Sequence, residues 1–309
     1  MRRAIPMILI ITLLLALLLA GSAPVAGEGG AEAAALARLL ERTAPAVATV
    51  RARLRVLMRF GAEQEEREQA LEARGALVSP RGLVMLSNSH LSAARWSEQL
   101  GAGAVGELSV QLVPAEIRVL LEGEEEERPA VLVASDAELD LAFVQLEPPP
   151  AGALPFVDFS APGAPAVGAR FAVVSRLGTA FDAAPYLETA RLAGQVRRPR
   201  EAWILDGVVT AFGLPAFDLA GRPLGVLTTV LSRTTGRAAP DGGEFEGPAP
   251  APRQRRENDR MGLFLVPADR VRTAIEGALA RVAERAGEAG APREGGSQAP
   301  GPEAPPARP

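Results

Sequence analysis

The fold is restricted most by a series of short apolar runs, each broken after a few residues by glycine, proline or charge. These runs are Ala46–Leu57, Gly75–Val78, Leu83–Leu86, Ile117–Leu121, Ala130–Ala134, Leu141–Leu146, Arg170–Val174, Leu224–Leu231 and Gly262–Val266. Many short strands with frequent turns are typical of β-barrels and β-sandwiches. The chain is therefore predicted to be all-β.

Three consecutive prolines, Pro148 to Pro150, predict a linker between two β units. A helix is predicted over Ala31–Arg42, where Pro45 ends it, and a second amphipathic helix over 268–284. These features divide the chain into two parts. Residues 31–147 are expected to hold the N-terminal helix and the first β unit, and residues 148–285 the second β unit and the C-terminal helix.

Segments 61–74, 236–260 and 286–309 are predicted to be disordered, because their charged or Gly/Pro-rich composition cannot bury a core. The run Glu124–Glu127 is interpreted as a solvated hairpin turn rather than a cation site. A set of loop arginines is interpreted as solvated charge, with an anionic partner as the alternative. They are Arg197, Arg198, Arg200, Arg253, Arg255 and Arg256.

The N-terminus has the order of a secretory signal peptide, predicted over residues 1–26. Arg2 and Arg3 precede an apolar run over Ile5–Ala20, and small residues follow it. An uncleaved membrane anchor is the alternative, although the apolar run is somewhat short for a span. In both cases the rest of the chain is expected outside the cytoplasm, in the periplasm or secreted. Contact with a membrane is expected only through this segment, if it stays uncleaved.

Composition excludes several classes of function. The net charge of −4 gives no global basic field, so no nucleic-acid partner is predicted. The absence of cysteine excludes thiol catalysis and cysteine-based metal sites, and a single histidine excludes a multi-histidine site. No metal and no cofactor is predicted.

Several segments, taken in order, resemble the HtrA (Do-like) serine proteases over roughly residues 43–285. They are Thr43–Val50, Gly75–Gly82, Leu86–His90, Asp136–Ala142, Gly221–Val226 and Gly262–Pro267. This resemblance implies a chymotrypsin-like double six-stranded β-barrel with a short N-terminal helix and a C-terminal helix. No segment after residue 285 resembles the PDZ domain that many relatives carry.

The resemblance also implies two members of a catalytic triad. Acyl transfer in this class needs a nucleophile, a histidine base and a carboxylate that orients the histidine. His90 is the single histidine and lies in the matching motif, Leu-Ser-Asn-Ser-His. Asp140, at the start of an apolar run, is the predicted carboxylate, with Asp136 as the alternative.

The third member is missing. The family carries its nucleophile in Gly-Asn-Ser-Gly-Gly-Pro, and counting back from the hairpin glycines Gly221 and Gly225 places 210–215 on that motif. Phe212 then stands at the serine position. Thr210, Ala211 and Gly213 stand at positions of the oxyanion loop.

Other serines and one further segment depart from the family pattern. Ser175 and Ser232 lack the glycine-flanked turn that exposes a nucleophile. Residues 91–116, which include Trp96, are interpreted as an insertion.

The resulting hypothesis is an exported pseudoprotease that works by binding, in a chaperone-like, regulatory or scaffolding role. Its expected partner is a peptide, an unfolded protein or an envelope protein, and the oligomeric state is left open. The alternatives are an active serine endopeptidase in envelope protein quality control and a purely structural envelope protein.

Overall fold

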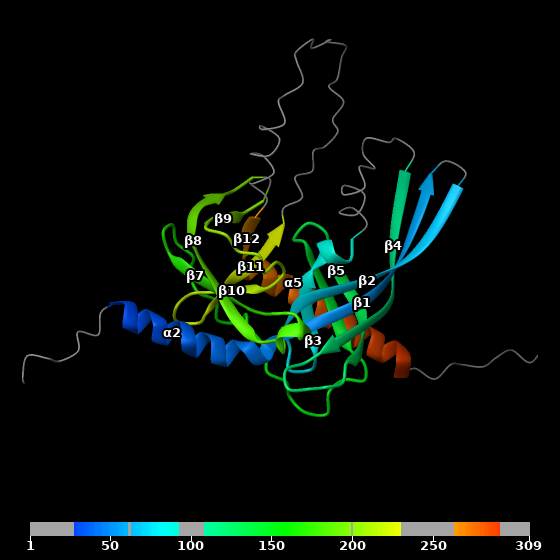
Figure 1. Cartoon of the computed structure of the whole chain (residues 1–309), viewed down its shortest axis with the longest axis horizontal. Helices are drawn as coiled ribbons and strands as arrows, with labels where there is room; N and C mark the ends of the chain where they lie inside the picture. Colours follow the sequence, from blue (N-terminus) through cyan, green and yellow to red (C-terminus); the bar gives the residue numbers. More distant parts are fainter. Residues whose placement is uncertain (1–27, 61–62, 93–107, 199, 230–262, 291–309) are drawn as a thin grey trace, which may run out of the picture.

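The computed structural model describes residues 28–60, 63–92, 108–198, 200–229 and 263–290. They form two closed six-stranded antiparallel β-barrels with one helix before and one helix after them (Figure 1). This confirms the predicted all-β class and the chymotrypsin-like double barrel. The predictions for residues 1–26 and 236–260 lie outside the described residues. Within the described part of the chain, no helix is long and apolar enough to cross a membrane.

The first barrel is closed in the order β1-β2-β3-β6-β5-β4. Its strands are β1 (Val47–Phe60), β2 (Glu63–Leu77), β3 (Leu83–Ser87), β4 (Leu108–Leu120), β5 (Arg128–Asp136) and β6 (Leu141–Leu146). All residues of β3 and β6, which pair with each other in the barrel wall, are buried. Phe143 is among the largest fully buried side chains there.

The second barrel is closed in the order β10-β11-β12-β9-β8-β7. Its strands are β7 (Arg170–Arg176), β8 (Pro185–Val196), β9 (Ala202–Asp206), β10 (Pro215–Phe217), β11 (Pro223–Thr229) and β12 (Leu263–Pro267). Strands β8, β9 and β10 were not predicted from the sequence. Most side chains of β8 are exposed or half-buried, and β10 has three residues, so neither produces an apolar run.

The two helices lie where the sequence predicts them. Helix α2 (Glu28–Thr43) packs against β7 and β8 and ends at the 3-10 turn η1 (Ala44–Ala46), which contains Pro45. Helix α5 (Ala268–Gly290) packs against β11 and β12 of the second barrel and also against β5 and β6 of the first. It continues to residue 290, so residues 286–290 of the predicted disordered tail are helical.

The prediction of disorder over 61–74 is wrong from Glu63 onward. Strand β2 pairs with β1 in an unbroken antiparallel register, from Val47 opposite Ala76 to Phe60 opposite Glu63. The acidic composition fits a strand because β1 supplies arginines on the same face; Arg55 forms an ion pair with Glu66 at 3.0 Å. Together β1, β2 and β4 extend beyond the barrel as a three-stranded arm (Figure 1).

The interpretation of 91–116 as an insertion is also wrong in part. Residues 108–116 belong to β4 and pair with β1, with a bulge opposite Arg53 and Leu54. Residues 93–107, with Trp96, lie outside the described residues. The glutamate run Glu124–Glu127 lies in the turn between β4 and β5, as predicted.

Candidate functional site

Asp140 is a buried carboxylate held by the segment that carries His90. The side chains of Ser87 and Ser89 donate hydrogen bonds to its two oxygens at 2.9 and 2.7 Å, and the backbone N–H of Ser89 donates at 2.7 Å. Its backbone oxygen accepts the N–H of Asn88 at 3.0 Å. Asp140 has a φ of 57° and is 3% exposed. Aspartate is one of the residue types that adopt this left-handed conformation.

Asp136, the alternative carboxylate, has a local role. It accepts the backbone N–H groups of Glu138 and Leu139, both at 2.8 Å, at the turn that follows β5. This is the behaviour of a turn-forming aspartate. Asp140, by contrast, binds the 3-10 turn η2 (Asn88–His90) directly. A hydrogen bond between His90 and Asp140 stays a prediction.

Gly213 fixes the position of the loop after β9. It has a φ of +77°, and its N–H donates to the oxygen of Leu227 at 2.7 Å. A Cβ added at Gly213 would lie 2.2 Å from the backbone nitrogen of Ser87. Only glycine fits so close an approach. The loop over 210–214 therefore packs directly against the segment that leads to His90.

A cavity of about 250 Å³ brings together the sequence-predicted residues His90, Thr210, Ala211 and Phe212. The other residues that line it are Glu72, Ala73, Arg74, Ser175, Arg176 and Tyr186. They come from both barrels, so the cavity lies at the junction between them. Gly213 follows Phe212 in the chain but does not line this cavity; it packs against Ser87.

Backbone donors of this loop already have acceptors inside the chain. In trypsin-like enzymes, the oxyanion hole uses the N–H of the nucleophile and that of the residue two positions before it. In the register predicted from the sequence, the corresponding groups belong to Phe212 and Thr210. The N–H of Thr210 donates to the Glu188 carboxylate at 2.7 Å, and the N–H of Phe212 donates to the Thr210 oxygen at 3.0 Å.

Glu188 belongs to the site but was not predicted from the sequence. It lies in β8, opposite Val173 of β7, and is half-buried. Besides the N–H of Thr210, its carboxylate accepts the Thr210 hydroxyl at 2.6 Å. Nothing in the sequence near Glu188 indicates this contact, because the two residues belong to different elements and β8 itself was not predicted.

Ser175 also lines the cavity, but it does not lie on a turn. It is in β7, opposite Tyr186 of β8, and is 2% exposed. A paired strand does not present a hydroxyl in the way that the glycine-flanked turn of a serine hydrolase does.

The two arginines of the cavity are bound to other parts of the protein. Arg74 donates to the backbone oxygens of Arg176 and Leu177, both at 2.9 Å. Arg176 donates to the backbone oxygens of Ala44 and Val47, at 2.7 and 2.9 Å. Their guanidinium groups therefore join the two barrels across the junction.

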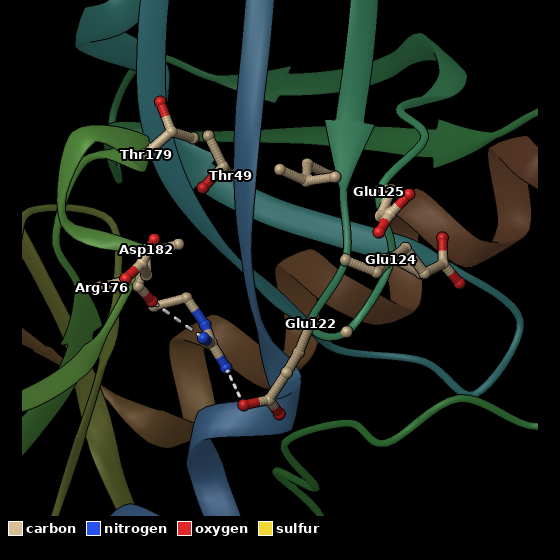
Figure 2. Close-up of a pocket in the computed structure, with 11 residues that line it drawn as sticks. Thr49, Glu122, Glu124, Glu125, Arg176, Thr179 and Asp182 are labelled. Atoms are coloured by element: carbon tan, nitrogen blue, oxygen red, sulfur yellow. Dashed lines mark hydrogen bonds and ion pairs between the residues drawn. The ribbon is translucent and has the colours of Figure 1, made fainter.

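A second cavity, of about 370 Å³, lies between the β4–β5 turn and the β7–β8 turn (Figure 2). The residues that line it are Thr49, Leu120, Leu121, Glu122, Gly123, Glu124, Glu125, Arg176, Thr179, Asp182 and Ala183. Figure 2 shows Arg176 directed at Glu122, with which it forms an ion pair at 2.6 Å. Glu124 is paired with Arg128 at the rim.

Arg197 and Arg198 are exposed, in agreement with the interpretation as solvated charge, but Arg200 is not. Its Nε atom is buried without a hydrogen-bond partner. Burial lowers the pKa of Arg200. Three nearby carboxylates oppose that change: Glu138, Asp140 and Asp136. Arg200 of the second barrel thus faces the acidic turn of the first.

Comparison with known proteins agrees with this architecture. Residues 73–226 match the family described as the trypsin-like peptidase domain. The match runs from β2 to β11 and includes His90, Asp140 and Phe212. No curated protein matches the chain.

The double barrel and this match define the class of protein. The chain carries a trypsin-like peptidase domain with the chymotrypsin fold.

Proposed function

We propose that this protein is an exported pseudoprotease of the HtrA type that binds peptide segments in the cavity between its barrels. The observation that carries the proposal is the residue beside His90. Phe212 lines the same cavity as His90, and the predicted register assigns Phe212 to the position of the family's nucleophilic serine.

A phenyl ring has no atom that can attack a carbonyl. Loss of the serine in a triad enzyme lowers kcat by about six orders of magnitude, and what remains depends on the oxyanion hole and substrate binding. The Thr210 and Phe212 N–H groups already donate to acceptors within the chain. They are therefore not available to stabilise an oxyanion, which argues against residual catalysis as well.

Binding is supported by the surfaces that remain. The cavity presents the half-buried side chains of Tyr186, Phe212 and His90, which supply aromatic surface for apolar or aromatic side chains of a peptide. Arg74, a charged residue that lines the cavity, is already hydrogen-bonded to backbone oxygens of the chain. We therefore expect recognition of unfolded or extended protein segments outside the cytoplasm, in a chaperone-like, regulatory or scaffolding role.

Two measurements on the purified mature protein test this proposal. A fluorophosphonate serine-hydrolase probe should give no labelling beside an active protease control. Fluorescently labelled unfolded casein should bind, and Phe212→Ala should weaken that binding. The matched control is Phe156→Ala, since Phe156 is 42% exposed and does not line the cavity. Equal binding by both variants would count against the cavity as the binding site.

An active peptidase is the second candidate, and one observation favours it. Ser175 lines the same cavity as His90. Probe labelling of the wild type that is lost in both Ser175→Ala and His90→Ala would establish the enzyme and overturn the pseudoprotease.

A further inference from the structure

We infer that Glu188 is an internal ligand of Thr210, and that it blocks a latent binding site for a carboxylate or carbonyl oxygen. Thr210 donates two hydrogen bonds, one from its backbone and one from its side chain, to a single carboxylate. The Glu188 carboxylate accepts the N–H of Thr210 at 2.7 Å and its hydroxyl at 2.6 Å.

The geometry of these bonds is that of a bound anion. Two donors on Thr210 converge on the two oxygens of one carboxylate, as they would on a carboxylate from outside. Hydrogen bonds to an ionised acceptor are shorter and roughly twice as strong as neutral ones. Glu188 therefore fills the acceptor position more firmly than water would.

The loop is also held from its other side, so removal of Glu188 should leave its shape intact. Gly213 is packed against the backbone of Ser87, and its N–H donates to Leu227. The N–H of Leu227 donates back to the oxygen of Leu214 at 3.1 Å. The Thr210 donors should then stay in place and face an empty acceptor position.

The Glu188 carboxylate would determine which peptides the cavity binds. This consequence rests on the proposed function. A peptide that binds the wild type cannot place a backbone carbonyl or a C-terminal carboxylate on Thr210, because Glu188 is already there. The wild type should therefore bind peptides through side-chain contacts, with free and amidated C-termini bound equally well. Replacement of Glu188 by alanine should favour the free C-terminus by about tenfold to a hundredfold, the range for one charge-assisted hydrogen bond.

The direct test uses acetate as the probe and the Thr210 amide as the reporter. In the wild type, the Thr210 amide should be protected from hydrogen exchange and should not respond to acetate in ¹H–¹⁵N NMR spectra. In Glu188→Ala, protection should be lost, and acetate should shift the Thr210 resonance saturably in the millimolar range. Sodium chloride at the same ionic strength should produce no such shift.

Two variants serve as controls. Glu188→Gln keeps an acceptor oxygen in place and should not respond to acetate. Glu201→Ala removes an exposed glutamate of the same barrel that accepts a hydrogen bond from Gln195, and this variant should behave like the wild type.

An unprotected Thr210 amide in the wild type would overturn the inference without any variant. A folded Glu188→Ala protein whose Thr210 amide ignores acetate would overturn it as well. Failure of casein binding would instead remove the proposed function and leave the acetate result unaffected.

Discussion

Replacement of Arg176 by leucine should destabilise the whole domain, because this side chain joins the two barrels. Arg176 is 8% exposed. Its guanidinium donates to Val47, Ala44 and, at 3.1 Å, Ala183, and it pairs with Glu122. Leucine fills part of the same volume but supplies no donor.

The magnitude follows from the acceptors that are left behind. A buried polar group that loses its partner costs about 1–3 kcal/mol. The Ala44 oxygen keeps the N–H of Val47 as a second donor, so most of the loss falls on Val47 and Ala183. Glu122 is 36% exposed and can be solvated, so its loss adds little. The expected loss of unfolding free energy is about 3 kcal/mol.

Urea unfolding, followed by circular dichroism, measures this loss. For a slope of about 2–3 kcal/mol per molar, the midpoint should fall by roughly 1 M. The matched control is Arg118→Leu, since Arg118 is 47% exposed and pairs with an exposed glutamate; it should cost less than about 1 kcal/mol. Equal midpoints for the two variants would refute the assignment of Arg176 as the link between the barrels.

Two further predictions concern the same junction. Gly213→Ala should destabilise by about 3 kcal/mol more than Gly123→Ala, because both glycines have a φ above 70° but only the Cβ at 213 meets backbone, at Ser87. Thermal unfolding of the pair measures the difference, and equal losses would show that the loop does not pack there. Burial raises the pKa of Glu72, but hydrogen bonds from Arg74 and Arg51 outweigh it and lower the pKa below 4.5. The stabilisation from Glu72 is thus present above pH about 4.5 and lost as pH falls further, so Glu72→Gln should weaken the pH dependence of stability in that range.

The architecture could be predicted because apolar runs and family motifs lie in fully buried strands such as β3 and β6. The arm could not, because β2 between Glu63 and Glu72 carries its charges on both faces and becomes a strand only through its pairing with β1. The local sequence of β2 does not indicate that it pairs with β1.

The same distinction applies to the site. Motif order places His90 and Phe212 in the sequence, and the structure brings them to one cavity. The contact between Glu188 and Thr210 joins β8 to the loop after β9, and neither strand was predicted. Long-range contacts made by polar side chains leave no periodic pattern, so they appear only when the fold is known.

The restoration of catalysis is the prediction that depends on all these contacts. Phe212→Ser alone should give no labelling by a fluorophosphonate probe, because the Thr210 and Phe212 N–H groups still have internal acceptors. Replacement of 210–214 by Gly-Asn-Ser-Gly-Gly restores the serine, but a glycine at 210 still has an N–H that Glu188 can bind.

The combination of that loop with Glu188→Ala should therefore label faster than the loop alone. Loss of one oxyanion donor costs about a hundredfold to a thousandfold in kcat, which sets the scale of the expected gain. His90→Ala in the combined variant should abolish the labelling. If the loop alone labels as fast as the combination, Glu188 does not control the oxyanion position; if neither labels, His90 and Asp140 are not aligned for catalysis.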